Sequence, residues 1–386
     1  MSKTEGNPFY SRQFLKNMQV KGQLFFNYEE SSWCWQLNQA RLQDAADNVV
    51  ELMTQHLHRF SEASQRVLQT AACIGKRFDL ALLAMVENSM EVHILTLLAP
   101  ALQDEMLLAV GDTGHQKVFQ FAHDRIQQAA YSINSQRNLN SLHLEIGQRL
   151  LEQISAEATE APLFEIVDQL NHGLEKIKRS QERVAYAQLN LRAGIKARGA
   201  MAYQAAIRYL ETAISLLPDD AWVDHYSLTF DLYLNASEVC DLCHLDDRFE
   251  ELIEVLLLKG RSSLDKAQAR IRQSIYFSRK GQMVENLEVG RLGLILFDID
   301  IPEIDDSDAL NLNFQNEMVI FRHYFLDKEF SSLYDLPVAH DLETDTILKL
   351  IASISESAIF TNYPLFSLIS ALGVNRSIAF GNALLS

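Results

Sequence analysis

The sequence contains few of the residues that interrupt helices. Its 386 residues include 15 glycines and seven prolines, the two residue types with the lowest helix propensity. Cysteine is also scarce, and four cysteines in a chain of this length do not make a disulfide framework. These absences predict a mostly helical protein with reduced thiols, and therefore a cytoplasmic location.

Long apolar runs and an excess of positive charge are missing as well. No apolar stretch approaches the roughly 20 residues that span a bilayer, and Met1–Glu5 lacks the apolar core of a secretory signal. The formal net charge of −17 repels nucleic acid and anionic membranes, and no local basic patch overrides it. We expect a soluble protein with no membrane insertion and no nucleic-acid partner.

The motifs of common catalytic sites are absent too. A P-loop needs G-x-x-x-x-G-K-[ST], because backbone N–H groups and the lysine wrap the phosphates, and no such stretch occurs. The patterns G-x-G-x-x-G, G-x-S-x-G and H-E-x-x-H are missing as well. We expect no catalytic residue, no metal site and no catalytic activity from this chain alone.

The first 44 residues contain one helical and one alternating pattern. Asn7-Pro8 is a typical helix start and Gly22 a typical stop. In the stretch LFFNYEESSWCWQL, which begins at Leu24, apolar residues alternate on both sides of a polar turn. This alternation predicts a β-hairpin.

Residues 45–135 combine helices with a second hairpin. Ser61 is positioned to cap a helix that ends at Gly75. Further elements follow: helices near 79–88 and 90–103, and strands at Met106–Val110 and Lys117–Phe121. A compact group of helices that is closed by a hairpin is typical of a winged helix, and we expect one here.

Beyond residue 135 the chain is helical almost throughout. In the clearest helix pair, Gly194 stands where two helices can approach closely. Ala206, Leu210 and Ala213 line the second helix at i, i+4 and i+7, and Pro218 ends it. Small residues at these offsets in a unit of about 34 residues are typical of tetratricopeptide repeats, whose helix pairs bury their apolar faces against each other. Weaker copies follow at Ala236–Leu256 and Ile275–Leu296. We expect a tetratricopeptide-like α-solenoid, interrupted by an acidic loop near 298–310.

Two short motifs are candidates for chemistry. His123-Asp124 stands where an alternating run meets a helix, and Asp124 is the expected cap of the helix Arg125–Ser132. His123 would then lie at a helix N-terminus, where free N–H groups favour an anion; the alternatives are a catalytic dyad and a core histidine. Cys240 and Cys243 form a C-x-x-C pair without a second ligand pair nearby, which favours packing over zinc binding.

The stretch FAHDRIQQAAY, residues 121–131, resembles the end of the winged-helix part of STAND-type nucleotide switches, signalling relatives of AAA ATPases. In that superfamily a histidine contacts the β-phosphate of ADP held by a preceding P-loop domain. The resemblance gives this role to His123, with Ala122 at the usual methionine position. The stretch TEGNPFYSRQFLK resembles the Gly-x-Pro element of the same superfamily, which assigns nucleotide contacts to Gly6 and Pro8.

The likeness extends over nearly the whole chain. Six segments resemble, in order, large bacterial proteins that join a serine/threonine kinase, an AAA-type ATPase, a repeat array and a sensor histidine kinase. These segments are NVVELM, AACIGKRFDLALLA, FAHDRIQQAAYSI, HLEIGQRLL, IVDQLNHGLE and LFSLISALGVNRSIAFGNA. In that family a P-loop precedes the Gly-Asn-Pro element. We therefore expect a fragment that lacks the P-loop and the kinase domains.

The resemblance implies a division into three parts. They are the C-terminal remnant of a nucleotide-binding domain at 1–44, a winged helix at 45–135 and tetratricopeptide-like repeats at 136–386. The implied function is a regulatory and interaction segment of a two-component signalling multi-kinase, which couples the ATPase nucleotide state to partner sensing. No cofactor is expected on this chain alone, since ATP or ADP belongs to the intact architecture. The implied partners are another protein or neighbouring domains of the same one.

A winged-helix transcription regulator that binds DNA is the alternative. Residues 45–135 contain ten acidic and six basic residues, and the helix near 90–103 carries Glu91 but no lysine or arginine. Phosphate contacts require the opposite balance of charge. The signalling hypothesis is therefore preferred.

Overall fold

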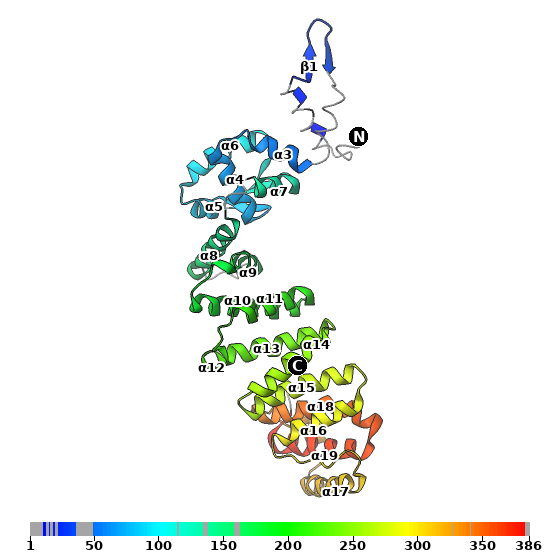
Figure 1. The fold of residues 1–386 in the computed structure, drawn as a ribbon. Coiled ribbons are helices and arrows are strands. Elements are labelled where there is room, and N and C mark those ends of the chain that lie inside the picture. The colour runs from blue at the N-terminus through cyan, green and yellow to red at the C-terminus, as the bar shows by residue number, and fades with distance from the viewer. Residues whose placement is uncertain are drawn as a thin grey trace. The chain divides into compact units, whose positions relative to one another are not determined.

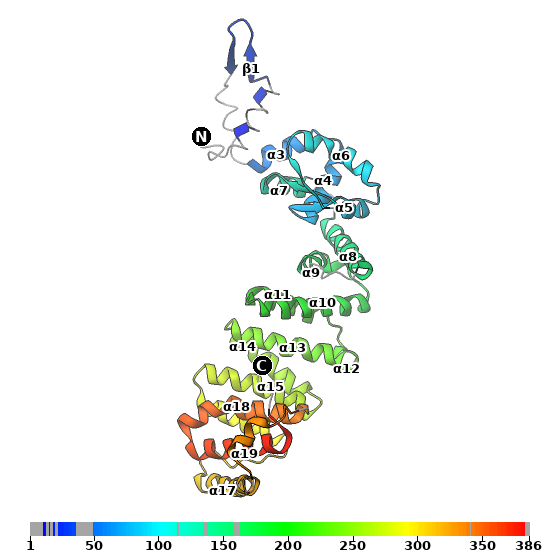
Figure 2. The same cartoon turned by 180° about the vertical axis from the view of Figure 1, so that it is seen from behind.

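The structure is a computed structural model of the chain. Helices prevail, and the described residues also form two small sheets (Figures 1 and 2). The prediction of a mostly helical protein is confirmed. The chain divides into two compact units, Met1–Lys178 and Arg179–Ser386, while the finer division into three parts stays a prediction. The structure describes residues 11–12, 15, 18–19, 22–35, 49–113, 116–133, 138–157, 163–326, 328–339 and 341–382.

The hairpin predicted near the N-terminus is confirmed. Strands β1 (Leu24–Asn27) and β2 (Ser32–Trp35) pair antiparallel, with Phe25 opposite Cys34. Gly22, which precedes β1, has a φ of +67°, a conformation that glycine adopts readily where a helix ends. The predicted helix start at Asn7 lies outside the described residues.

Helices α3 to α7 form most of the core of the first unit. Their bounds are Val49–Leu57 (α3), Glu62–Ile74 (α4), Leu80–Val86 (α5), Glu91–Gln103 (α6) and Asp124–Ser132 (α7). The predicted cap of α4 is confirmed, because the Ser61 hydroxyl accepts a hydrogen bond from the Ser64 N–H at 3.1 Å. The helix ends before Gly75, as predicted.

A three-stranded antiparallel sheet lies beside these helices in the order β3-β5-β4. Its strands are Arg77–Asp79 (β3), Leu107–Thr113 (β4) and Gln116–Phe121 (β5). Strands β4 and β5 were predicted from the sequence, whereas β3 was not, since three residues are too few to display alternation. Phe78 of β3 lies opposite Phe119 of β5, and both side chains are buried. The short strand is thus held by the core rather than by its local sequence.

Two further helices and a turn complete the first unit. They are α8 (Leu139–Glu157), α9 (Leu163–His172) and the 3₁₀ turn η1 (Leu174–Lys176). Helix α8 also packs against α4 and α5. This contact brings α8 and α9 close to the end of α4, where a polar network described below is located.

The second unit consists mainly of helices that pack in consecutive pairs. The pairs are α10 (Ser180–Gly199) with α11 (Tyr203–Leu216), α13 (Tyr226–Leu242) with α14 (Asp246–Lys259), and α15 (Ser263–Arg279) with α16 (Met283–Ile295); the short α12 (Ala221–Asp224) precedes α13. The predicted close approach at Gly194 is confirmed, because a Cβ there would lie 2.7 Å from Cγ of Leu210. Ala206, Leu210 and Ala213 are fully buried, as the spacing predicted.

A group of three helices ends the described chain. Helices α17 (Ser307–Tyr324), α18 (Leu342–Thr361) and α19 (Tyr363–Phe380) follow, with the 3₁₀ segment η2 (Phe330–Asp335) before α18. Helix α17 begins inside the stretch expected to be a loop, because the Asp306 side chain caps it at the Ala309 N–H.

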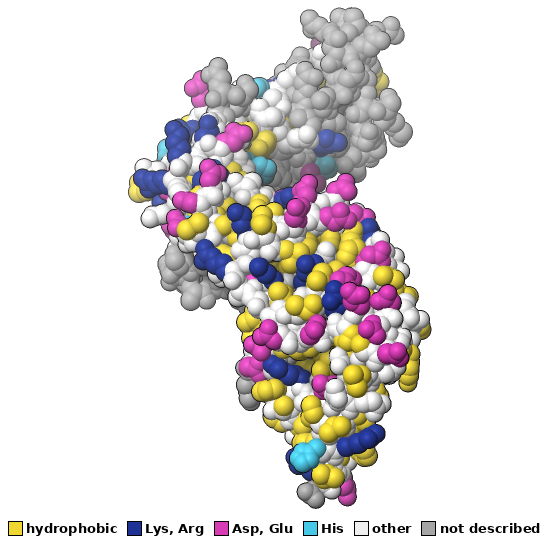
Figure 3. All heavy atoms as spheres, turned by 60° about the horizontal axis from the view of Figure 1, so that its bottom comes forward, with side chains coloured by type: hydrophobic (Ala, Val, Ile, Leu, Met, Phe, Trp, Pro, Cys, Tyr) yellow, Lys and Arg dark blue, Asp and Glu magenta, His cyan; other side chains and the backbone are white. Residues whose placement is uncertain are grey.

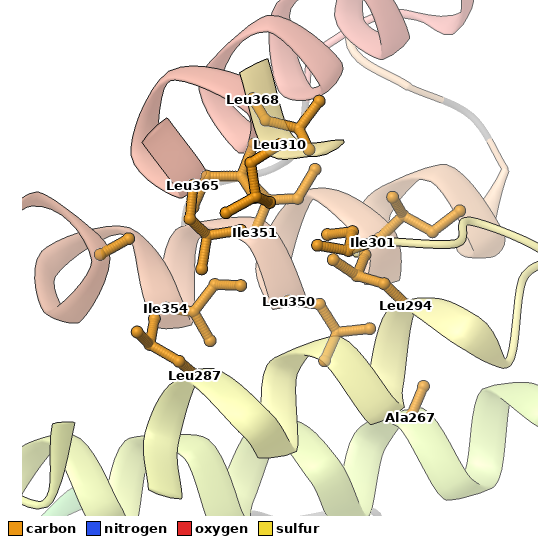
Figure 4. Packing of buried hydrophobic residues seen from close by; sticks show 13 residues of the cluster. Ala267, Leu287, Leu294, Ile301, Leu310, Leu350, Ile351, Ile354, Leu365 and Leu368 are labelled. Carbon is orange, nitrogen blue, oxygen red and sulfur yellow. The ribbon is translucent and has the colours of Figure 1, made fainter. Parts of the chain in front are cut away.

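Charged and hydrophobic side chains share the visible surface of the molecule (Figure 3). Beneath the surface of the second unit, a buried apolar cluster joins α15, α16, α17, α18 and α19 (Figure 4). Leu350, Ile351 and Ile354 of α18 contribute to its centre. Helix α18 therefore belongs to the same core as the α15–α16 pair.

Candidate functional site

His123 lies at the junction between β5 and α7. It is partly buried, and its extended backbone (φ −152°, ψ 149°) places it as the N-cap of α7. Its Nδ1 atom accepts a hydrogen bond from the Arg125 N–H at 3.2 Å. In the neutral imidazole the proton is therefore on Nε2, which is the atom that can donate to an acceptor.

The prediction that Asp124 caps α7 was wrong. Asp124 is the first residue of α7 and does not cap it, because the side chain that accepts from the helix N–H is that of His123. The Asp124 carboxylate instead pairs with the Lys76 ammonium at 2.7 Å. The hydrogen bond from Lys76 lowers the pKa of Asp124 from its ordinary value, so an anion at this place meets both a cation and a carboxylate.

The start of α7 offers an anion fewer unpaired N–H groups than the sequence predicted. The N–H groups of Ile126 and Gln127 donate to the His123 carbonyl at 3.0 and 3.3 Å, and the Arg125 N–H donates to the imidazole. Three N–H groups of the first turn therefore already have acceptors in His123. Gly6 and Pro8, the other predicted nucleotide contacts, lie outside the described residues.

A buried polar network, which was not predicted from the sequence, links four helices of the first unit. The Tyr131 hydroxyl is 3.0 Å from Nε2 of His143, and Nδ1 of His143 is 2.6 Å from Oε1 of Gln169. The Gln169 amide nitrogen donates to the carbonyls of Cys73 and Ile74 at 2.8 and 3.3 Å. The network thus joins α7, α8 and α9 to the end of α4.

The hydrogen bonds define the state of the histidine in this network. Because the Gln169 NH₂ group donates to carbonyls, its oxygen faces His143 and accepts from Nδ1–H. Nε2 is then the acceptor for the Tyr131 hydroxyl. Burial lowers the pKa of His143, which keeps the ring neutral near pH 7. The neutral ring can hold the helices together without an unpaired charge.

No local motif could have revealed the network. Two of its residues do lie in segments that resemble the signalling family, His143 in HLEIGQRLL and Gln169 in IVDQLNHGLE. Their separation of 26 positions, however, has no periodicity that predicts contact. Only the packing of α8 and α9 brings them together.

The C-x-x-C pair has the environment of packing residues. Cys240 is fully buried, and burial raises its pKa to about 12. Cys243 is partly buried, and burial raises its pKa as well. A thiolate is the form that binds metal or attacks a disulfide, so neither cysteine is prepared for such chemistry. Across the described residues, no three or more His, Cys, Asp or Glu side chains are grouped to hold a metal ion.

Within the described part of the chain, no single helix has the length and apolar character that crossing a membrane requires. Helices α5 and α6 have the required length and apolar character only when taken together, and they are bent by 107° relative to each other.

The chain has a distant relative among known proteins. No protein family matches the chain, and no solved structure is significantly similar. The chain is similar to hybrid signal transduction histidine kinase G of Dictyostelium discoideum, with 27% identity over 311 residues. The match covers 65% of this chain but 9% of that protein, so it concerns a small part of a much longer polypeptide.

Proposed function

We propose that this chain is a regulatory and interaction segment of a multidomain signal-transduction protein. The observation that carries the proposal is the similarity to the hybrid histidine kinase, which covers most of this chain and little of the kinase. Because this segment itself contains no catalytic motif, it would act by changing the conformational state of other domains. Kinase and ATPase activities belong to those other domains in this proposal.

The first unit is proposed to contain a winged helix. Its elements follow the order α4, β3, α5, α6, β4, β5, and its sheet has the order β3-β5-β4. This fold is expected to have a helix, a short strand, two helices and then a hairpin that pairs with the short strand. The support is topological, since no solved structure matches.

The second unit is proposed to be a tetratricopeptide-like array. Helix pairs follow one another, and each pair packs on the next through buried small and apolar residues. Such an array would bind a partner, or pass on a conformational change, through its helix faces, because each pair is stabilised only by its neighbours. Its partner would be another protein or a neighbouring domain.

The winged helix is proposed to respond to a nucleotide that another segment holds. Nε2 of His123 and the Lys76 ammonium are the donors that would contact the β-phosphate of ADP. This contact would favour the closed state, because a ligand shifts an equilibrium only by binding one state more tightly than the other. Neither hydrolysis nor tight nucleotide binding is proposed for this chain alone, since it lacks a phosphate cradle.

The test uses a longer polypeptide in which a P-loop domain precedes this chain. His123→Ala should weaken ADP binding in calorimetry while circular dichroism shows the helices intact; loss of the cap costs about 1 kcal/mol. His58→Ala, at an exposed position of the same unit, is the matched control. ADP affinity that is equal in both variants would refute the role of His123.

A DNA-binding winged helix is the second candidate, and the order of the elements favours it equally. Charge does not, because α6 carries Glu91 and exposes Met90 and Val92 at its start instead of lysine or arginine. A gel shift with duplex DNA at low salt separates the two candidates. Retarded DNA would favour the transcription regulator.

A further inference from the structure

An open cavity of about 570 Å³ lies in the second unit, between α13, α15 and α18. Its volume is within the range of ligand sites, about 300–1,000 Å³. The residues that line it are Leu234, Gln268, Ile271, Arg272, Ile275, Leu342, Asp345, Thr346, Lys349, Ala352 and Ser353. Neither the sequence motifs nor the relative assigns a role to this cavity.

One part of the lining is apolar and accessible. Ile275 of α15 is 42% exposed and Leu342 of α18 is 56% exposed, and Leu234 and Ile271 are partly buried beside them. Burial of such surface by a ligand is worth about 25 cal/mol per Å². The cavity therefore offers an anchoring place for a large apolar side chain.

The other part of the lining is polar and incompletely paired. The Asp345 Oδ2 atom is 2.8 Å from the Lys349 ammonium, whereas its Oδ1 atom is buried and has no hydrogen-bond partner among the described residues. A buried acceptor without a donor is costly, at about 1–3 kcal/mol. A ligand that brings an N–H group to Asp345 would remove this cost.

The charges next to the cavity favour a negatively charged ligand. Arg272 pairs with Glu238 at 2.6 Å, but Glu238 also pairs with Arg198 of α10. One carboxylate thus serves two guanidinium groups. Among the residues that line the cavity, Arg272 and Lys349 are cationic and Asp345 is anionic. The lining therefore has one more positive than negative side chain, in a chain whose net charge is −17.

The walls of the cavity are fixed by a polar cluster that includes the lining residue Ser353. The Ser274 hydroxyl donates to the Ser353 hydroxyl at 2.8 Å, which joins α15 to α18. The Asn286 amide of α16 donates to the Ser274 carbonyl at 2.6 Å and to the Ser353 carbonyl at 3.3 Å. These bonds set the position of α18 against the α15–α16 pair, so the cavity is preformed and little ordering is needed on binding.

We propose that this cavity binds a short acidic segment of a protein partner. A large apolar side chain of the segment enters between Leu234, Ile271 and Ile275. A neighbouring carboxylate pairs with Arg272 and Lys349, and a backbone N–H donates to Oδ1 of Asp345. The proposal deepens the proposed function, because it rests on the helical array as an interaction segment.

The open shape of the cavity favours a peptide over a small metabolite. A site for a small molecule usually encloses about 70–90% of its ligand, whereas this cavity is open to solvent on one side. A peptide main chain also supplies, side by side, the N–H and C=O groups that suit an unpaired acceptor and nearby cations. The charge excess then selects acidic residues next to the apolar anchor.

The test uses the full chain and an array of synthetic dodecapeptides. Each peptide has one central apolar residue (Leu, Ile, Phe, Met or Trp) flanked by Glu, Gln or Lys in otherwise identical sequences. The expected result is retention of the Glu-flanked peptides, with affinity measured by fluorescence anisotropy and weakened by salt. Equal binding of the three sets, or retention of no peptide, would overturn the proposal.

Point variants locate the binding. Ile275→Asp and Lys349→Gln should each weaken the best acidic peptide about tenfold or more, a size typical of a central contact. The matched controls are Ile359→Asp and Lys259→Gln on α14. Ile359 belongs to α18, is 47% exposed and lies outside the cavity. Thermal melting confirms that each variant is folded.

The outcomes separate the two proposals. Acidic peptides that bind all four variants equally would refute this site while leaving the helical array as an interaction segment. If Ile275→Asp does not fold, Lys349→Gln decides alone, because it removes a partly exposed charge and no core contact.

Discussion

The packing of α16 against α18 leads to a sharp prediction about Gly290. A Cβ at this position would lie 2.2 Å from Cγ2 and 2.9 Å from Cδ1 of Ile354. The Ile354 side chain is 1% exposed. Ile354 is β-branched and stiff in a helix, so it cannot turn away freely. Gly290→Ala should therefore destabilise the second unit by about 1–3 kcal/mol, the usual cost of an overpacked core, even though alanine is the better helix former.

A double-mutant cycle shows whether this cost comes from the contact. Ile354→Ala alone should cost about 2–5 kcal/mol, since it leaves a cavity. In the double variant the added methyl group occupies part of that space, so its cost should fall short of the sum by about 1–2 kcal/mol. Urea unfolding of the full chain, followed by circular dichroism at 222 nm, gives the free energies.

The control is the same substitution at Gly199 of α10, where a Cβ would meet nothing within 4 Å. Gly199→Ala should be neutral or slightly stabilising. If Gly290→Ala is as harmless as this control, or if the two substitutions in the cycle are additive, the close packing of α16 on α18 is wrong. The cavity proposal would then lose the support of a fixed α18.

Three further predictions concern the buried polar and thiol groups. Gln169→Leu should destabilise the first unit by about 2–4 kcal/mol in urea unfolding, since it removes the acceptor of the His143 Nδ1–H and the donor to the Cys73 and Ile74 carbonyls, whereas Gln103→Leu at an exposed position should change little. Burial lowers the pKa of His143 in the folded protein, so as the pH falls this imidazole is protonated first in the unfolded chain. The free energy of unfolding should therefore be unaffected above about pH 6.5 and should decrease as the pH falls below it. His143→Gln should show a smaller decrease between pH 7.5 and 5.5. Cys240, whose pKa burial raises to about 12, should resist a disulfide reagent at pH 8 in the folded protein and react once urea unfolds it; rapid labelling without urea would contradict its burial.

Features that depend on local sequence were predictable. Ser61 has the side chain of an N-cap and lies directly before an apolar-periodic run, and it does cap α4. Gly194 and Leu210 belong to neighbouring helices of one repeat-like pattern, so their contact follows from the stacking that such patterns require. The hairpin β1–β2 likewise followed from alternation on both sides of a polar turn.

Features that depend on distant partners were not predictable. Whether His123 or Asp124 caps α7 is decided by Lys76, which draws the carboxylate away from the helix N–H groups. Strand β3 exists because Phe78 packs on Phe119. The cavity in the second unit joins residues of α13, α15 and α18, and Leu234 of α13 precedes Leu342 of α18 by 108 positions. No spacing rule connects them.

The most direct test of the central claim is calorimetry of the isolated chain with ADP and Mg²⁺. The claim is that this polypeptide responds to a nucleotide held by another segment and does not hold one itself. It predicts no saturable heat at ADP concentrations up to the millimolar range, with or without the His123→Ala substitution. A micromolar dissociation constant for the unmodified chain would contradict the claim.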